Sequence, residues 1–279
     1  MLGAAICFST GGLLVRLADA TPPAAMVFWR SSVVFVFLLA VLWLWHGRRM
    51  MLKVRDGGGA GVLSALFLGA TFCLFILAVT RTTVANAAAL MSTGPLMLTA
   101  SAWLFLGEKP RAVTWLAILA ALGGVALMFA DGIGSGGAMM GNLLALGIPA
   151  AFTASYILLR RAPGRMDPTV TSMVASLFAA LAMLPFAWPL APPGADLPVL
   201  LAMGVLQTGM GLVLMSQAIP RLSAGELGMV GLLEMVLAPV WVWLAIGEQP
   251  TGAALLGGVV VVGAVFLNEL YAVKSVKGA

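Results

Sequence analysis

Two stretches of the chain match each other 140 residues apart: Trp103–Pro110 reads WLFLGEKP and Trp243–Pro250 reads WLAIGEQP. The match begins earlier, at Arg81 and Arg221, each of which precedes its stretch by 22 residues. A weaker similarity continues for about 20 residues beyond the two prolines. Self-similarity at a fixed distance indicates that the chain consists of two related halves.

The composition is that of a membrane protein. Of the 279 residues, 62% are hydrophobic and 9% are charged, and the mean hydropathy is +1.08. A soluble domain carries about 25% charged residues, so lipid must surround most of this chain. The net charge of +5 comes from basic residues in short gaps between apolar runs. That distribution is typical of bilayer proteins and argues against a nucleic-acid partner.

Ten apolar runs are long enough to span a bilayer, which takes roughly 20 residues of helix. The runs are residues 2–18, 24–45, 59–79, 83–106, 112–130, 140–160, 168–190, 197–219, 224–246 and 251–271. Turn-forming Pro, Gly and Asp residues separate most of them. The breaks at 80–82 and 220–223 are short and lack glycine, which leaves a count of eight or nine open. The total apolar length favours ten.

The basic residues predict the orientation. Of the 15 Lys and Arg residues, 12 fall on one side of the predicted spans, and only Arg16, Arg30 and Arg81 fall on the other. Cytoplasmic loops carry the excess of basic residues. We therefore expect a multi-pass protein of the inner membrane with both termini in the cytoplasm.

Each half, residues 1–131 and 139–272, contains five predicted spans. With an odd number of spans the second half must insert upside down, which makes an inverted-topology repeat. The predicted fold is therefore all-α, with ten transmembrane helices as two inverted five-helix repeats around a central cavity. Repeats of this kind alternate between states open to either side, with substrate bound between the halves. Because the repeat is internal, we expect a monomer.

The repeated segments, Ala78–Pro110 and Ala218–Pro250, resemble a known family. Both combine a short polar break, a span rich in small residues, and a Gly-Glu pair. The sequences that carry the resemblance are STGP at 92–95, LGE at 106–108, LLEM at 232–235 and IGE at 246–248. They resemble the EamA-type repeat of the drug/metabolite transporter superfamily, over nearly the whole chain. The family usually has proline at the position of Met235, and Pro239 lies one turn later, so we expect a displaced helix break.

The resemblance implies ten helices in a basket around a central cavity, and export of metabolites such as amino acids. It also implies that helices one, three, four, six, eight and nine line the cavity. Among members of the superfamily, size and architecture favour the aromatic amino-acid exporter type.

Glu234 is the principal candidate for substrate binding. It lies about ten residues into the ninth span, where a carboxylate costs at least ~2.5 kcal/mol. It could bind a substrate ammonium group, take up a proton that drives exchange, or serve as a permanently protonated packing residue.

Other polar residues within the spans are weaker candidates for substrate contact: Gln207, Tyr156, Ser9, Ser92, Asn86 and Arg30. Gln207 and Tyr156 are bulky, so we expect them to face inward. Ser and Thr in spans usually bond between helices. Asn86 and Glu226 occupy equivalent repeat positions suited to capping or gate contacts. Arg30 could attract a substrate carboxylate or extend to the outer interface.

Glu108 and Glu248 have a structural interpretation. The glycines before them, Gly107 and Gly247, suit helix C-caps, and the prolines that follow suit the first turn of the next helix. A carboxylate just before that turn would complement its dipole.

Enzyme chemistry has little support. The chain has one histidine, His46, no His-Glu-x-x-His motif and no phosphate-binding Walker loop. We therefore expect no cofactor and no metal, and secondary transport of a small molecule. Two alternatives remain: a proton-coupled drug or organic-cation exporter of the same fold, and a lipid flippase or non-transporting membrane sensor.

Overall fold

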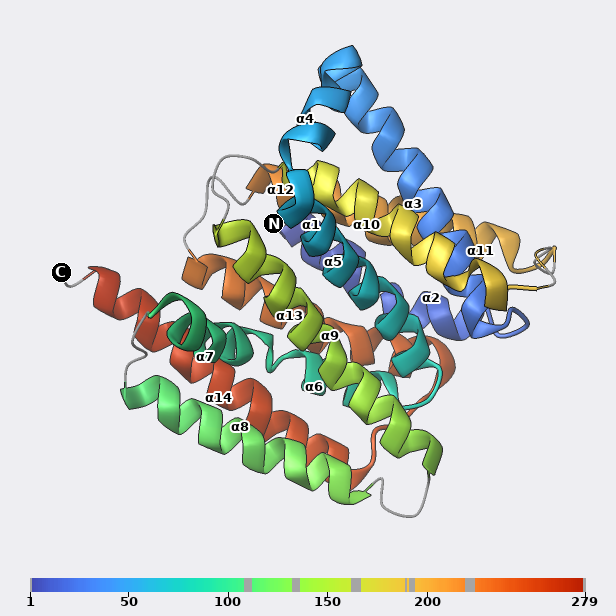
Figure 1. Cartoon of the computed structure of the whole chain (residues 1–279). Helices are drawn as coiled ribbons and strands as arrows, with labels where there is room; N and C mark the ends of the chain where they lie inside the picture. Colours follow the sequence, from blue (N-terminus) through green and yellow to red (C-terminus); the bar gives the residue numbers. More distant parts are fainter. Residues whose placement is uncertain are drawn as a thin grey trace.

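The computed structural model describes residues 2–107, 112–131, 136–161, 167–188, 190, 194–218 and 224–277. Within these ranges the chain is helical and contains no strand, which confirms the all-α prediction. The helices, shown in Figure 1, are α1 Leu2–Ser9, α2 Gly11–Leu17, α3 Pro23–His46, η1 Gly47–Arg49, α4 Met50–Asp56, α5 Gly58–Val79, α6 Val84–Met91, α7 Gly94–Leu106, α8 Ala112–Asp131, α9 Gly136–Arg161, α10 Pro168–Met183, η2 Leu184–Phe186, α11 Leu197–Ala202, η3 Met203–Gly209, α12 Met210–Ala218, α13 Ala224–Ile246 and α14 Gly252–Lys277.

Six helical segments are long and apolar enough to cross a membrane. They are Pro23–Asp56, Gly58–Val79, Val84–Phe105, Ala138–Leu159, Pro168–Phe186 and Leu197–Ala218. Shorter apolar stretches occupy the positions of the other four predicted spans: Leu2–Leu17, Ala112–Leu127, Val236–Ile246 and Leu255–Asn268. A multi-pass membrane protein is therefore confirmed, whereas the count of ten spans stays a prediction.

Helices of one half pack mainly against helices of the other. Three pairs join elements at equivalent positions in the two halves: α3 with α10, α6 with α13, and α8 with α14. In Figure 1, α8 and α14 lie side by side along one flank of the molecule. In addition, α5 packs against both α9 and α10. The core is thus shared between the halves.

Close approach of α8 and α14 depends on a glycine. A Cβ atom at Gly124 would lie 2.7 Å from the carbonyl oxygen of Gly257 and 2.8 Å from the Val261 side chain. A Cβ atom at the adjacent Gly123 would meet nothing within 4 Å. Small residues let membrane helices approach closely because association there depends on packing rather than on the hydrophobic effect.

We expect Gly124→Ala to lower the stability by about 1–3 kcal/mol, because the new methyl group overpacks this interface. The matched variant Gly123→Ala should be neutral or slightly stabilising, by up to about 1 kcal/mol, because alanine favours helix. The thermal unfolding midpoint of each variant in detergent, compared with that of the parent, measures these two stability changes. Equal midpoints for the two variants would contradict the proposed contact.

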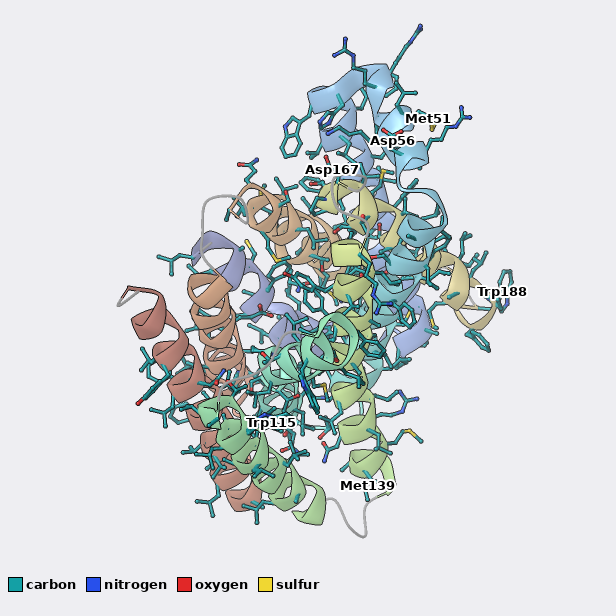
Figure 2. The ribbon with its side chains drawn as sticks, turned by 60° about the vertical axis from the view of Figure 1, so that its left-hand side comes forward. Met51, Asp56, Trp115, Met139, Asp167 and Trp188 are labelled. Carbon is teal, nitrogen blue, oxygen red and sulfur yellow. The ribbon has the colours of Figure 1, made fainter. Side chains whose placement is uncertain are left out.

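Many polar side chains are buried in the bundle, and many large apolar side chains are exposed on its outside. Buried hydrogen bonds join Ser64 to Ser155 and Thr82 to Asn142. In contrast, Leu44 is 82% exposed and Trp188 is 79% exposed. Figure 2 shows Trp188 at the periphery of the molecule. This arrangement suits a protein whose outer surface contacts lipid.

Contacts between the ends of the helices agree with the predicted sides. Asp56 and Asp167, both in predicted cytoplasmic loops, lie at one end of the molecule, and Met139 lies at the other (Figure 2). The ion pair between Lys53 and Asp167, with an N–O distance of 2.8 Å, also joins two predicted cytoplasmic loops. Which end faces the cytoplasm stays a prediction.

Asp167 also begins α10, since its carboxylate accepts the Thr169 backbone N–H at 2.9 Å. Burial by itself raises the pKa of the Asp167 carboxyl group. The hydrogen bonds from Lys53 and from the Thr169 amide outweigh burial and hold the pKa below its ordinary value.

A lowered pKa in the folded protein means that ionised Asp167 stabilises the fold. The contribution is complete above the ordinary aspartate pKa of about 3.9 and is lost as the pH falls through the lower pKa of the folded state. We expect Asp167→Ala to cost about 1 kcal/mol through the lost cap. Asp167→Asn keeps a capping oxygen, so it should cost less and should flatten the pH dependence. Thermal unfolding between pH 7 and pH 3 measures the stability of both variants and its pH dependence. A pH profile of Asp167→Asn equal to that of the parent would contradict the stabilising role of ionised Asp167.

Candidate functional site

A cavity lies where the first, third, fourth and ninth predicted spans meet. The empty space between its walls is about 290 Å³, a figure that includes space open to solvent. Its walls are formed by Phe8, Gly12, Phe75, Val79, Val84, Ala87, Ala88, Met91, Glu234 and Ala238. The described residues of the sixth and eighth predicted spans do not border it, although the family resemblance had implied that they would.

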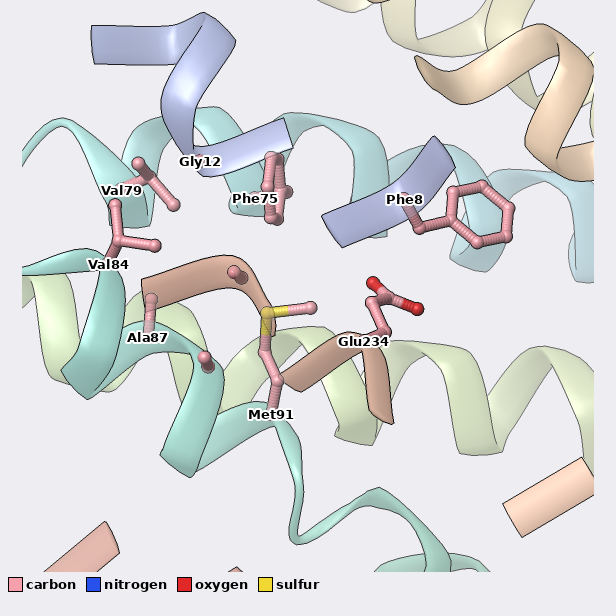
Figure 3. A pocket seen from close by; sticks show the side chains of 10 residues that line it. Phe8, Gly12, Phe75, Val79, Val84, Ala87, Met91 and Glu234 are labelled. Atoms are coloured by element: carbon pink, nitrogen blue, oxygen red, sulfur yellow. The ribbon is translucent and has the colours of Figure 1, made fainter. Parts of the chain in front are cut away.

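Glu234 is the one charged residue among those that line the cavity. It lies on α13, and its carboxyl group is directed across the cavity toward Phe8, with Met91 beside it (Figure 3). The carboxyl group has no hydrogen-bond partner among the described residues. The sequence had selected Glu234 as the principal candidate, and it is the candidate that faces the cavity.

Two of the helices that form the cavity are interrupted beside it. The chain bends at Thr10, between α1 and α2, and at Ser92-Thr93, between α6 and α7. At both places adjacent hydroxyl groups donate to carbonyl oxygens three residues back: Ser9 to Ile6 and Thr10 to Cys7, Ser92 to Ala89 and Thr93 to Leu90. Such bonds compete with the helical pattern. Interrupted helices are typical of transporter binding sites.

The expected break in the ninth span is absent, since α13 continues as a helix from Ala224 to Ile246 with Pro239 inside it. The two halves therefore differ, because the equivalent span of the first half is divided into α6 and α7. An uninterrupted α13 holds Glu234 on a continuous helix.

An ion pair lies next to one end of the cavity, beside the lining residue Val84. Arg16, one turn beyond Gly12 on α2, donates through Nε to Glu248 at 2.8 Å and through Nη2 to the Thr82 carbonyl at 2.9 Å. Glu248 also accepts the backbone N–H of Val84 at 2.9 Å. These contacts join the first, fourth and ninth spans at the side predicted to be outer.

The interpretation of Glu248 is thereby corrected. Its carboxylate complements the N-terminus of α6, which belongs to the other half, and not that of α14, the next helix. Pro250 precedes α14, which begins at Gly252. The predicted C-caps are confirmed, because Gly107 has φ 72° and Gly247 has φ 71°, both left-handed. Glu108 lies outside the described residues.

An apolar contact lies directly beneath the ion pair. A Cβ atom at Gly12 would come within 2.5 Å of a Val84 methyl group, so α2 and α6 meet here with no space between them. We call Gly12, Arg16, Val84 and Glu248 the closure. Figure 3 shows Gly12 and Val84 at one end of the cavity and Glu234 at the other.

Breaking the ion pair should favour opening at this end. Hydrogen bonds to charged groups contribute about 1.5–3 kcal/mol each, so Glu248→Gln should raise the open population about tenfold. The test uses Met91→Cys, with Cys7→Ser and Cys73→Ala, and measures its alkylation by an impermeant maleimide from the predicted outer side.

Lys53→Gln is the matched control for this test, because it breaks the other described ion pair, at the opposite end of the molecule. Its alkylation rate should equal that of the parent. If Glu248→Gln also leaves the rate unchanged, the ion pair does not hold the cavity closed.

Three further sequence candidates lie next to lining residues but have other partners. Ser9 accepts the indole N–H of Trp241 at 2.9 Å, and Ser92 bonds within its own helix. Asn86 donates to Thr82 Oγ1 at 3.3 Å and to Asn142 Oδ1 at 3.2 Å, so it links α6 to α9. None of these three lines the cavity. The side chain of Glu226 lies outside the described part of the chain.

The remaining candidates, Tyr156, Gln207 and Arg30, differ in how much of the side chain is exposed. Tyr156 on α9 is 36% exposed and does not border the cavity. Gln207 and Arg30 are both buried, at 5% and 2% exposed. Extension of Arg30 to the outer interface is therefore excluded in this structure. Both residues lie behind the cavity wall formed by Phe75.

Sequence reasoning missed the closure and most of the apolar wall. In the sequence Arg16 is only a charge on the predicted outer side, and Phe8, Val84 and Ala87 carry no polar signal. One signal did exist: Gly11 and Gly12 follow two hydroxyl residues within a predicted span, a pattern that favours a break. The partners of that break depend on the tertiary fold.

Comparison with known proteins agrees with this geometry. The model of the EamA-like transporter family matches residues 1–130 and again residues 139–270. The chain belongs to the EamA-like transporter family. It is therefore a membrane transporter of the drug/metabolite type and not an enzyme.

Characterised and uncharacterised relatives cover nearly the whole chain. The pseudopaline exporter CntI of Pseudomonas aeruginosa is 31% identical over 271 residues, 93% of this chain and 90% of its own. The uncharacterized transporter YwfM of Bacillus subtilis is 28% identical over 92% of this chain and 88% of its own.

A solved crystal structure of another protein supports the fold alone. It superposes with a TM-score of 0.67 at 18% identity, covering 97% of this chain and 96% of that chain.

Proposed function

We propose that this EamA-like transporter is a secondary exporter of amino acids or similar small amine-bearing metabolites. It would work by alternating access in the inner membrane, with both termini cytoplasmic. In this proposal the ten spans form two inverted five-helix repeats, residues 1–131 and 139–272. The double match of the family model and the pairing of equivalent helices support such a repeat.

The observation that carries the proposal is the position of Glu234. A carboxylate inside a membrane bundle is costly, and in such proteins it usually marks a substrate or ion pathway. Here it faces aromatic and aliphatic side chains, Phe8, Phe75 and Met91, with no hydrogen-bond partner among the described residues. A substrate ammonium group would satisfy the carboxylate, while the apolar wall would contact the rest of the solute.

The size of the cavity supports alternating access. The space that a water-sized molecule could occupy in it is about 20 Å³, which is room for about one water molecule. The closure blocks one end. A metabolite would therefore enter and leave only as the helices move apart, first at one end and then at the other.

Export rather than uptake is supported by the relatives, since CntI is an exporter of pseudopaline. Proton coupling is the principal competing mechanism, because Glu234 could carry a proton instead of contacting the solute. The two roles differ in their response to an imposed pH gradient.

Substitution of Glu234 tests the proposal. Glu234→Gln keeps the shape of the side chain but removes its charge, so counterflow of an amine-bearing solute in proteoliposomes should fall by about tenfold or more. Asp196→Asn, which alters a buried carboxyl group outside the cavity, should leave counterflow unchanged. Thermal midpoints in detergent should show that both variants remain folded.

Repeating the assay with a pH gradient imposed and removed separates the two mechanisms. Flux that depends on Glu234 but not on the gradient supports solute binding, and flux that collapses with the gradient supports proton coupling. Counterflow of Glu234→Gln equal to that of the parent would contradict both. Absence of flux for an entire amino-acid panel in the parent would contradict amino-acid export.

A further inference from the structure

Arg30 is a buried cation without a counterion. It lies on α3 with 2% of its surface exposed, and none of the described acidic side chains forms an ion pair with it. One guanidinium nitrogen, Nη2, donates to the Phe72 carbonyl oxygen, whereas Nε has no partner. A buried arginine that retains an unsatisfied N–H in a membrane bundle is a candidate for contact with a negatively charged group.

The ring of Phe75 connects Arg30 with the cavity. The guanidinium carbon lies 5.8 Å from the centroid of the Phe75 ring and 5.7 Å from that of Phe72. Phe75 also lines the cavity that contains Glu234. The Phe75 ring therefore separates Arg30 from the cavity, and a rotation of this side chain would open Arg30 to the cavity.

Gln207 and the Phe75 ring both lie close to Gly11. The position of a Cβ atom at Gly11 would be 2.9 Å from Gln207 Nε2 and 3.1 Å from Phe75 Cζ, so the amide and the ring tip flank Gly11 together. The Thr208 hydroxyl group donates to Gln207 Oε1. The amide oxygen of Gln207 is therefore bonded to Thr208, and its NH₂ group lies on the side of Phe75.

The backbone that carries Gln207 has an unusual form. Residues Met203–Gly209 adopt a π-helix, a rare form that is frequently found at functional sites. This segment packs closely on α3, since a Cβ atom at Gly204 would lie 3.2 Å from the Arg30 carbonyl oxygen. The wide turn and this close packing together place Gln207 and Arg30 around Phe75.

We propose that Arg30 and Gln207 form a carboxylate-binding subsite, reached by displacement of the Phe75 ring. This inference rests on the proposed function and specifies its substrate as a zwitterion. The ammonium group would bind Glu234, and the carboxylate would accept hydrogen bonds from Arg30 Nε and Gln207 Nε2. The apolar side chain would contact Phe8 and Met91. A solute with both charges would pair with both groups, whereas an amine would leave Arg30 unpaired.

Counterflow with matched solutes tests this subsite. Purified full-length protein in proteoliposomes is assayed with phenylalanine, with phenethylamine, which lacks the carboxylate, and with 3-phenylpropionate, which lacks the amine. The parent should prefer phenylalanine to both. Arg30→Gln should lower kcat/KM for phenylalanine relative to phenethylamine by about tenfold or more, since a charge-assisted hydrogen bond to the carboxylate is lost.

Three further variants keep the test decisive if Arg30→Gln folds poorly. Gln207→Glu places a negative charge in the subsite, so it should lower the same ratio by repelling the carboxylate. Gln207→Met removes the amide at similar volume and should lower the ratio less. Arg30→Lys keeps the charge and should recover part of the preference. Size-exclusion profiles and thermal midpoints identify variants that are folded.

The outcomes separate the two proposals. Equal losses for phenylalanine and phenethylamine in folded variants would mean a purely structural role for Arg30 and Gln207 and would overturn the subsite. A parent that carries phenethylamine as well as phenylalanine would also overturn it while leaving the role of Glu234 intact. A parent that carries none of the three, nor any amino acid, would instead contradict the proposed function.

Discussion

In the hydrocarbon core of a membrane no water is available to backbone N–H and C=O groups, so each must be bonded within the protein. This constraint makes the spans helical and confines irregular backbone to places that protein surrounds. The bends at Thr10 and at Ser92-Thr93 and the π-helix at 203–209 all lie beside the cavity or its Phe75 wall. At both bends, hydroxyl groups bond to carbonyl oxygens of the preceding turn.

The few charges within the bundle belong to two classes. Arg16 and Glu248 satisfy each other and also bond to backbone groups of Thr82, which precedes α6, and of Val84, which begins it. Arg30 and Glu234 have no ion-pair partner among the described residues. A satisfied pair holds helices together, whereas an unpaired charge inside a membrane bundle is costly until a ligand neutralises it. The first class therefore suits closure of the cavity, and the second suits binding of a solute.

Closure and binding share structural elements. The segment from α1 to α2 carries Phe8 and Gly12 of the cavity wall and Arg16 of the closure. Likewise, α13 carries Glu234 and leads directly to Glu248. A displacement of either element would change the cavity wall and the closure together. Such coupling is what alternating access needs, because occupancy of the site and opening of one end must depend on each other.

Much of the architecture follows from local sequence. Long apolar runs can only be helices in lipid, and the WLxxGE repeat with its left-handed glycines determines where α7 and α13 end. Glu234 could be identified because a carboxylate in a span is conspicuous against its apolar neighbours. The partners of Glu248, the contact between Gly12 and Val84, and the grouping of Arg30, Gln207 and Phe75 could not be predicted. Each joins residues far apart in the chain, and only the packing of one half on the other decides which side chains meet.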